Sequence, residues 1–149
     1  MHVLVIGAAG MVGRKLVARI AADGAVGGRP VTKLSLVDVV APQLPAGLAG
    51  EAWAADISAG GAADRMVAGR PELIFHLAAI VSGEAEADFD KGYRINLDGT
   101  RLLFEEIRQE SLRAAGEGAE YKPRVVFTSS IAVFGAPFPE AIGDEFFTT

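Results

Sequence analysis

Residues 3–16 read VLVIGAAGMVGRKL, an apolar run that passes through a glycine-spaced turn into a helical pattern. Gly7 would let the chain turn sharply out of a strand, Gly10 would let backbone amides approach a pyrophosphate, and Gly13 would let the helix pack against the sheet. The amino-terminal end of a helix favours an anion. Spaced glycines also occur in ordinary turns, but a strand before and a helix after is the setting of a dinucleotide-binding motif. The stretch therefore predicts a phosphate-binding corner.

The composition indicates one domain and excludes several partners. The chain has 149 residues, of which 50% are hydrophobic, and this is enough for one sizeable core. A formal net charge of -5 argues against nucleic acid and anionic membrane surfaces. Cysteine is absent, which removes thiolate metal sites and fits a reducing compartment. No apolar run is long enough to span a bilayer, so we expect a cytoplasmic protein. We also expect no metal site.

Short runs rich in Val, Ile, Leu and Phe alternate with helical patterns, which is typical of an α/β protein with a parallel sheet. The expected strands are residues 2–6, 33–37, 52–55, 73–77 and 124–128. The first, fourth and fifth are almost continuously apolar, so we expect helices on both of their faces. A Rossmann-like, doubly wound sheet in the order 3-2-1-4-5 leaves the fifth strand at an edge. We expect that edge to be covered by self-association, by further chain, or by a tail carrying Phe146 and Phe147.

Helical spacing locates the first crossover helix between the first two strands. The apolar residues that recur in it are Val12, Leu16 and Ile20, and Asp23-Gly24 closes it. A second, short helix is expected over residues 59–69. The loops over residues 24–30 and 41–50 are rich in turn residues, and we expect solvent-exposed connections there rather than sites. Trp53 is expected in the core.

A long helix is expected over residues 86–115. Its sheet-facing stripe, at steps of three and four, would consist of Phe89, Tyr93, Asn96, Thr100, Leu103 and Ile107. Asn96 would then be buried, where an unpaired amide costs about 1–3 kcal/mol, so it must find partners. Two interpretations stay open: Asn96 bridges backbone groups of the fourth and fifth strands, or it orders a catalytic lysine through water.

Two acidic residues follow neighbouring strands. Asp38 ends the second strand, where a carboxylate can accept both hydroxyls of an adenine-linked ribose. A 2′-phosphate would face this carboxylate, so NAD is favoured over NADP unless Arg14 compensates. Alternatively, Asp38 is a solvated residue at a strand end. Asp56 could accept the adenine amino group while the Ile57 amide donates to the ring, or Asp56 or Ser58 could cap the next helix.

The fourth and fifth strands also end in candidate residues. His76-Leu77-Ala78-Ala79 leaves the fourth strand, and its small residues would permit the close approach of a flat ligand. His76 lies in an apolar run and is interpreted as a buried, hydrogen-bonded strand histidine rather than a catalytic one. Thr128-Ser129-Ser130 ends the fifth strand, where hydroxyls can bond a substrate oxygen or can cap a turn.

These motifs together resemble the short-chain dehydrogenase/reductase superfamily, in its extended branch of NAD-dependent epimerases and dehydratases. The resemblance spans nearly the whole chain and rests on Gly7-x-x-Gly10-x-x-Gly13, Asp38, Asp56-Ile57, His76-Leu77-Ala78-Ala79, Asn96-Leu97-Asp98-Gly99-Thr100, Thr128-Ser129-Ser130 and Val133-Phe134-Gly135. It implies that NAD is bound by Gly7, Ala9, Gly10, Met11, Val12, Asp38, Asp56, Ile57, Leu77, Ala78, Ala79, Ile80, Asn96 and Thr128. It also implies that Ser130 is the catalytic serine, which hydrogen-bonds the reacting oxygen.

The resemblance further implies an oxidoreductase or epimerase acting on a secondary alcohol of a sugar-like small molecule, either a nucleotide sugar or a sugar acid. Residues 89–105 and 136–147 are most similar to D-erythronate dehydrogenase-like members. The family's Tyr-x-x-x-Lys pair is missing, because neither Tyr93 nor Tyr121 has a lysine four positions on. We therefore expect residues 1–149 to be one dinucleotide-binding domain, the amino-terminal half of a longer enzyme, inactive alone and homo-oligomeric, as a dimer. The alternatives are a non-catalytic NAD-binding module or sensor and, less favoured, a flavin- or phosphate-binding protein.

Overall fold

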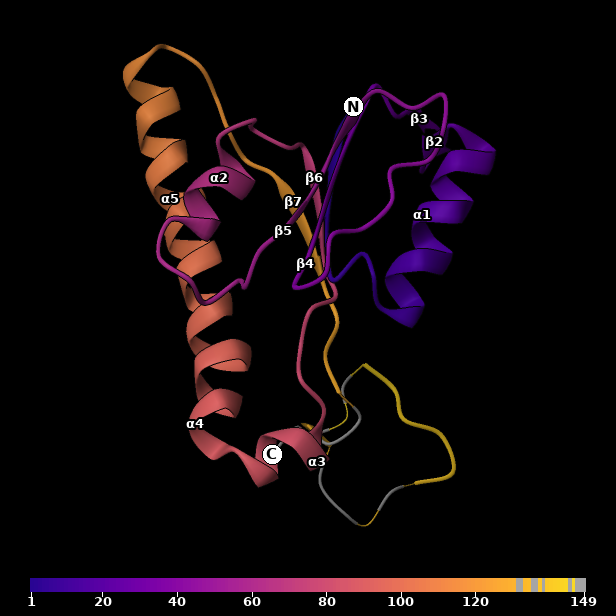
Figure 1. Cartoon of the computed structure of the whole chain (residues 1–149), viewed down its shortest axis with the longest axis vertical. Coiled ribbons are helices and arrows are strands. Elements are labelled where there is room, and N and C mark those ends of the chain that lie inside the picture. Colours follow the sequence, from indigo (N-terminus) through magenta and orange to yellow (C-terminus); the bar gives the residue numbers. More distant parts are fainter. Residues whose placement is uncertain (131–132, 135–136, 138, 145, 147–149) are drawn as a thin grey trace.

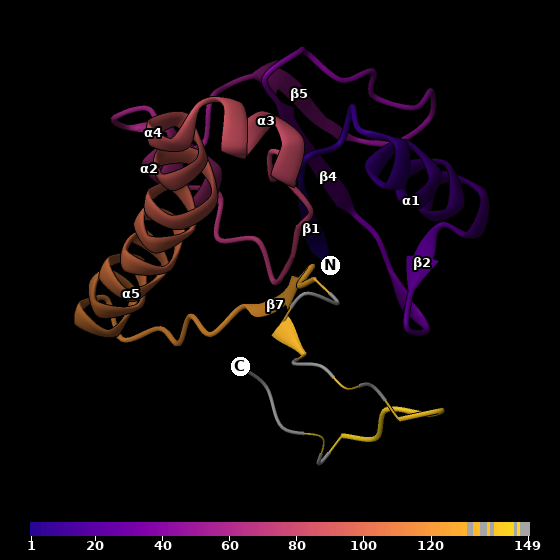
Figure 2. The same cartoon turned by 90° about the horizontal axis from the view of Figure 1, so that it is seen from below.

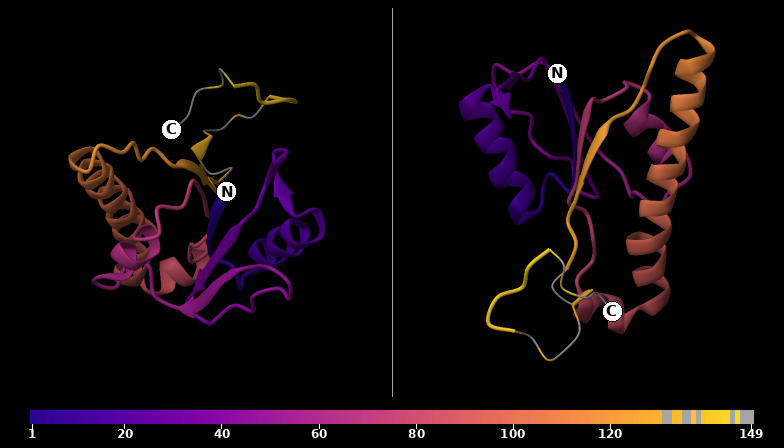
Figure 3. Two further views of the ribbon diagram at one scale, coloured as in Figure 1. Left: turned by 90° about the horizontal axis from the view of Figure 1, so that it is seen from above. Right: turned by 180° about the vertical axis from the view of Figure 1, so that it is seen from behind.

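Figure 1 shows the computed structural model of the chain, which describes residues 1–130, 133–134, 137, 139–144 and 146. A five-stranded parallel sheet forms the middle layer, with helices on both faces (Figures 1 and 3). Its strands are β1 (His2–Ile6), β4 (Lys33–Asp38), β5 (Gly50–Ala54), β6 (Leu73–His76) and β7 (Arg124–Phe127). They lie in the order β5-β4-β1-β6-β7. The predicted strand order and Rossmann-like class are confirmed, with small shifts at the strand ends.

The centre of the sheet is fully buried. β1 pairs with β4 on one side and β6 on the other, so that Ile6 lies opposite both Val37 and His76. Val3, Leu4 and Val5 are 0% exposed. An uninterrupted apolar run suits a strand whose two faces are both covered by helices, as predicted for β1.

Helix α1 (Met11–Asp23) covers one face of the sheet. It ends as predicted, because Gly24 takes the left-handed conformation with φ of 64° and donates its N–H to the Ile20 carbonyl. The helix turns Gly13, Val17 and Ile20 inward, whereas Val12 is 54% exposed. The expected stripe is therefore wrong at Val12.

The predicted connection over residues 24–30 contains a small hairpin. Strands β2 (Ala25–Val26) and β3 (Arg29–Pro30) pair antiparallel around Gly27-Gly28. Both glycines have positive φ, 55° and 76°, which is the backbone requirement of the tight hairpin turn that matches strand twist. The Gly-Gly pair was the sequence signal for this hairpin.

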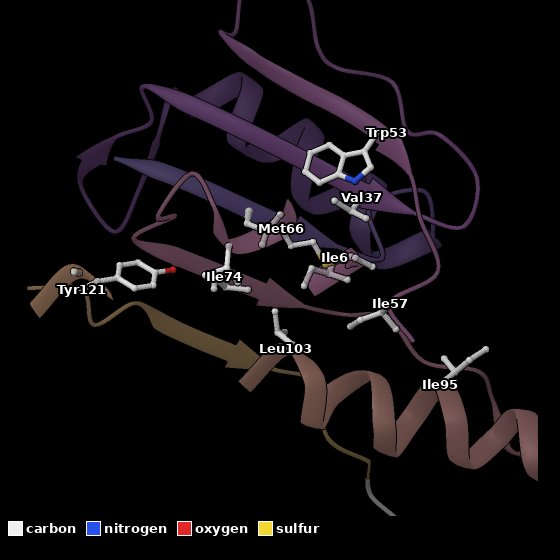
Figure 4. Close-up of a cluster of buried hydrophobic side chains, with 13 residues drawn as sticks. Ile6, Val37, Trp53, Ile57, Met66, Ile74, Ile95, Leu103 and Tyr121 are labelled. Carbon is white, nitrogen blue, oxygen red and sulfur yellow. The ribbon is translucent and has the colours of Figure 1, made fainter. Parts of the chain in front are cut away.

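The opposite face carries α2 (Ala62–Val67) and α5 (Thr100–Gly116). The chain reaches α5 from β6 through α3 (Ser82–Ala87), which lies beyond the carboxyl ends of the strands, α4 (Phe89–Gly92) and the π-helix η1 (Tyr93–Gly99). In Figure 4, Leu103 extends from α5 toward the sheet residues Ile6 and Ile74, and Trp53 lies on the side of the same buried cluster away from α5. This cluster fixes α5 against the sheet. Trp53 is a core residue, as predicted.

The prediction of one continuous helix over residues 86–115 is wrong. The helix is interrupted at Asp88, and η1 has wider turns than an α-helix, which changes the direction of the side chains along it. Phe89 and Tyr93, expected on the buried stripe, are 66% and 54% exposed. The residues of the expected stripe that do face the sheet are Thr100, Leu103 and Ile107.

Strand β7 lies at the edge and is only partly covered. It pairs with β6, and no other strand of the described residues pairs with it. Val126 is 42% exposed and Phe127 is 50% exposed, so the expectation that helices cover both faces of this strand is wrong. In the tail, the Phe146 ring packs on Phe134 with centroids 5.9 Å apart, and Phe147 lies outside the described residues.

Candidate functional site

A cleft of about 1210 Å³ opens where β1, β4, β5 and β6 end. Figure 2 looks onto this edge of the sheet. The sequence-predicted residues that line the cleft are Gly7, Ala9, Gly10, Asp38, Asp56, Ile57, Leu77, Ala78, Ala79 and Ile80. In doubly wound sheets the crevice outside the carboxyl ends of the strands is where ligands bind. The structure therefore brings together, at the expected edge, residues from four separate strand ends.

Two of the glycines at the first turn are required by close backbone contacts. Gly7 has φ of +88°, and a Cβ placed on it would lie 2.8 Å from the Ala78 nitrogen. A Cβ on Gly13 would lie 2.1 Å from the Gly7 oxygen. Gly10 is different, because the nearest atom to its Cβ position is 3.3 Å away and the residue is exposed. Gly7 and Gly13 therefore let the turn and the helix pack closely, and Gly10 keeps the mouth of the turn open.

The amino-terminal end of α1 has no compensating group of its own. Its N-cap is Gly10, no side chain caps it, and its first turn holds no acidic residue. The first-turn amides, including those of Met11 and Val12, have no partner within the helix. An uncapped helix start of this kind attracts an anion through its N–H groups and the helix dipole.

Asp38 is held between β4 and the glycine turn. Its Oδ2 accepts a hydrogen bond of 2.8 Å from the Ala9 N–H, and its Oδ1 accepts one of 2.7 Å from the Val39 N–H. The residue is half-buried and lines the cleft. The carboxylate and the anion-attracting helix start therefore face the same space, and Asp38 is more constrained than a solvated strand end.

Asp56 lies in a second polar cluster, after β5. Asp56 Oδ1 accepts from the Ser58 N–H at 2.8 Å and from Ser58 Oγ at 2.6 Å. Arg94 of η1 donates from Nη1 to Asp56 Oδ2 at 2.9 Å and to Ser58 Oγ at 2.8 Å. Burial raises the pKa of the Asp56 carboxyl, but hydrogen bonds from Ser58 and Arg94 outweigh it and the pKa is lowered overall. Asp56 therefore stays ionised at the cleft.

The structure also decides whether Asp56 or Ser58 caps the next helix, which the sequence left open. The N-cap of α2 is Gly61, so neither Asp56 nor Ser58 caps that helix. Arg94 was not singled out in the sequence, where no local pattern connects it with Asp56.

Asn96 clamps the loop that follows β6. The Ile80 N–H donates to Asn96 Oδ1 at 2.9 Å, and Asn96 Nδ2 donates to the Ile80 oxygen at 3.0 Å. Asn96 is exposed rather than buried, and its partner is one loop residue rather than backbone of two strands. Both parts of that expectation are wrong, because the π-helical turns place Ile95 toward the cleft and Asn96 beside it.

His76 is a buried strand residue, as expected. It is 1% exposed, and burial lowers its pKa. Its Nε2 lies 3.0 Å from Thr100 Oγ1, and that hydroxyl donates to the backbone carbonyl oxygen of Asn96. Because the Thr100 hydroxyl proton is directed to Asn96, His76 Nε2 acts as the donor to Thr100 Oγ1. His76 Nδ1 has no hydrogen-bond partner among the described residues.

The hydroxyl residues after β7 lie outside the cleft lining. The Thr128 N–H donates to the His76 oxygen at 3.1 Å, and both Thr128 and Ser130 are exposed. The Ser130 carbonyl accepts from the Val133 N–H at 3.2 Å. Gly135 lies outside the described residues.

A loop that was expected to be a simple connection forms one wall of the cleft. Residues 39–46 line it, so that expectation is wrong for the first part of residues 41–50. Pro42, Leu44 and Pro45 are partly buried in this wall, and Leu44 packs against the core.

Two findings complete the description of the site. No group of His, Asp and Glu within the described residues has the arrangement of a metal site. Among the same residues, no helix has the length and apolar character needed to cross a bilayer.

The sheet order and the glycine turn are those of the Rossmann-like proteins. The chain belongs to the NAD dependent epimerase/dehydratase family, whose model matches residues 3–149. This membership confirms the resemblance to the extended short-chain dehydrogenase/reductase branch.

Several known proteins are similar to the chain. It is 38% identical to a D-erythronate dehydrogenase from Cupriavidus necator, over 97% of this chain and 43% of that protein. A crystal structure of a nucleoside-diphosphate-sugar epimerase from Agrobacterium tumefaciens is 63% identical with a TM-score of 0.88, over 100% of this chain and 43% of the other. MoeE5 in complex with UDP-glucuronic acid and NAD is 26% identical with a TM-score of 0.70, over 98% of this chain and 42% of the other. The chain thus spans less than half the length of these relatives.

Proposed function

We propose that this chain is the cofactor-binding region of an NAD-dependent oxidoreductase or epimerase. The observation that carries the proposal is the 2.8 Å contact between the Ala9 amide and Asp38, which sets a carboxylate beside an uncapped helix start in one cleft. This pair suits a ribose next to a diphosphate. Family membership and the similarity to an NAD complex support the same cofactor.

The proposal assigns each part of NAD to residues in or beside the cleft. The diphosphate is assigned to the α1 start and its turn, at Gly7, Ala9, Gly10, Met11 and Val12. Asp38 is assigned to the adenine-linked ribose, Asp56 and Ile57 to adenine, and Leu77, Ala78, Ala79, Ile80, Asn96 and Thr128 to the remaining length. When bound, the nicotinamide supplies hydride acceptor and donor chemistry. The chain's own contribution is to bind and orient this group.

The substrate proposed for the whole protein is a small sugar-like molecule with a secondary alcohol. The names of the relatives, a D-erythronate dehydrogenase and a nucleoside-diphosphate-sugar epimerase, support a sugar acid or a nucleotide sugar. Ser130, exposed beyond the end of β7, is proposed to hydrogen-bond the reacting oxygen. The proton-transferring tyrosine and lysine are assigned to the part of the relatives' length that this sequence does not span.

A second candidate function is a non-catalytic NAD-binding module or sensor. Turnover of a secondary alcohol by a protein containing this chain would exclude this candidate. NAD binding without turnover would favour it.

The proposal includes a homo-oligomer, with a dimer as the simplest form. Exposed apolar side chains support it on two surfaces: Val126 and Phe127 on β7, and a groove lined by Phe89, Tyr93 and Leu97. Burial of such patches is the usual reason that they persist. A cytoplasmic location is proposed from the absence of cysteine, which fits a reducing compartment.

Calorimetric titration with NAD and NADP tests the cofactor assignment. Asp38→Ala is expected to weaken NAD binding by about 1.5–3 kcal/mol, because hydrogen bonds to a charged acceptor are lost. NADP is expected to bind more weakly than NAD to the parent chain, although Arg14 also lines the cleft.

The matched control is Asp98→Ala, which removes an exposed carboxylate paired with Arg101 and outside the cleft lining. It should leave NAD affinity unchanged, as should Ser130→Ala. Equal NAD affinity in Asp38→Ala and the parent chain would show that the ribose assignment is wrong.

A further inference from the structure

We propose that Arg94 is a positioning residue for the adenine end of the cofactor, acting through the Asp56 carboxylate. This inference rests on the proposed NAD-binding function. Arg94 is neither in the cleft lining nor in any motif recognised from the sequence. Its guanidinium nevertheless joins η1 to the loop after β5, across 38 sequence positions.

In the π-helical segment, three consecutive residues make three different sets of contacts. Ile95 is 9% exposed and lines the cleft. On either side of it, Arg94 contacts Asp56 and Ser58, and Asn96 clamps Ile80. A single turn of η1 therefore tethers the two loops that flank the end of the cleft, and π-helical turns are frequent at functional sites.

The contacts of Arg94 fix the orientation of the Asp56 carboxylate. Ser58 holds Oδ1 through two donors, and Arg94 holds Oδ2 through Nη1. The same Nη1 also donates to Ser58 Oγ, so the three side chains form a closed ring of hydrogen bonds. The Asp56 side chain is still 34% exposed. Since each carboxylate oxygen has two lone pairs, the fixed carboxylate retains acceptor capacity toward the cleft.

The free hydrogen-bonding groups at this point match one particular base. Asp56 can only accept, and the Ile57 N–H donates to no acceptor in the part of the chain that the structure describes. Adenine offers a donor at its 6-amino group and an acceptor at N1, which is the complementary pattern. Hypoxanthine offers an acceptor at position 6 and a donor at N1, so both contacts would be opposed. A site built to hydrogen-bond a group rejects the analogue that lacks it.

This reversal provides the experiment. The protein is titrated with NAD and with its hypoxanthine analogue, deamino-NAD, and the ratio of the two dissociation constants is the readout. The parent protein is expected to favour NAD by about tenfold or more, as for a hydrogen bond to a charged acceptor. Arg94→Ala is expected to weaken NAD binding about five- to tenfold and to leave deamino-NAD binding within about twofold. The reason is that Ser58 alone then holds the carboxylate, through Oδ1, and Oδ2 is no longer fixed toward the base.

Two further variants make the test specific. Arg94→Lys is expected to restore most of the ratio, because one nitrogen makes both contacts and an ammonium can replace it. Arg101→Ala removes the same charge from the next helix, where the arginine pairs only weakly with Asp98 at 3.7 Å, and should leave the ratio unchanged. Thermal unfolding of each variant confirms that it is folded.

The outcomes separate this inference from the proposed function. If Arg94→Ala weakens both ligands equally, or neither, Arg94 has a structural role at most and the inference is wrong, while the NAD assignment stands. Tighter NAD binding by Arg94→Ala would also overturn it, since the guanidinium would then compete with adenine for Asp56. Failure of the parent protein to bind NAD would overturn the proposed function itself.

Discussion

Strands β1 and β7 are both short, parallel and mostly apolar, yet their side chains differ in how far they are exposed to water. In β1, Val3, Leu4 and Val5 are completely buried between two neighbouring strands. In β7, which has one neighbour, Val126 and Phe127 remain 42% and 50% exposed. An apolar run therefore predicts a strand, but its place in the sheet determines how much water it excludes. The same contrast separates the glycine turn after β1, which lines the cleft, from Ser130 after β7, which does not.

The largest expected effect is on core packing in the two strands. Leu4→Ala should lower the free energy of unfolding by about 2–5 kcal/mol, since it removes a fully buried side chain and leaves a cavity. Val126→Ala should cost about 1 kcal/mol or less, because much of that side chain is already in water. Chemical denaturation measures both. Equal losses would show that β7 is as well covered in solution as β1.

The helix that follows β1 and the helix that precedes β7 give the next contrast. Gly13→Ala should destabilise the protein by about 1–3 kcal/mol, because its Cβ would meet the Gly7 oxygen at 2.1 Å. Gly116→Ala, where no atom lies within 4 Å of the Cβ position, should be neutral or stabilising by about 0.5–1 kcal/mol. Denaturant midpoints of the pair measure the difference. A stable Gly13→Ala protein would mean that α1 does not pack closely on the turn.

The next prediction concerns His76 of β6, the strand between β1 and β7. Its protonation reports how far water is excluded from the sheet one strand from its edge. Burial lowers the pKa of His76 below its ordinary value of 6.5. The unfolded chain therefore binds more protons than the folded one as the pH falls through 6.5, and the free energy of unfolding decreases there. This stability is fully present above that pH.

His76→Gln should reduce the slope of unfolding free energy against pH between about pH 5 and 7, by at most about 1.4 kcal/mol per pH unit. His2, whose pKa is also lowered by burial, supplies the matched variant His2→Gln. Denaturation at several pH values gives both slopes. A slope unchanged by His76→Gln would place that ring in a wet environment.

The smallest effect on stability is expected at the exposed edge itself. Val126→Lys should change the free energy of unfolding by about 0.5 kcal/mol or less, as at other exposed sites, but it should reduce self-association through the edge. Light scattering over a range of concentrations detects the change. Ala119→Lys, which adds the same charge at an exposed position before β7, is the control. Monomeric parent protein at high concentration would argue against an interface at this edge.

The features predicted correctly from sequence are those written into local chain geometry. The role of Gly7 follows from its positive φ and its contact with Ala78, which leave no room for a side chain. Asp38 could be placed because parallel strands bring their carboxyl ends to one edge. These constraints involve a few consecutive residues or a general property of the fold.

The features that were missed depend on contacts between distant segments. The π-helical turns gave no sign in the spacing of apolar residues, so Phe89, Tyr93 and Asn96 were expected on the wrong face. Arg94 binds Asp56 from 38 positions away, and its direction depends on those turns. The exposure of Val126 depends on what else packs against β7, which an apolar pattern does not specify.

A π-helical turn is in effect an α-helix with one inserted residue. Deleting one residue within Tyr93–Gly99 would restore regular winding and rotate what precedes it by about 100° relative to α5. Arg94 would then leave Asp56 while Leu103 kept its place against the sheet. The extra residue thus lets one continuous helical segment contact both Asp56, through Arg94, and the sheet, through Leu103. Among related chains, a one-residue gap at this point is expected to mark proteins that hold the adenine end by other means.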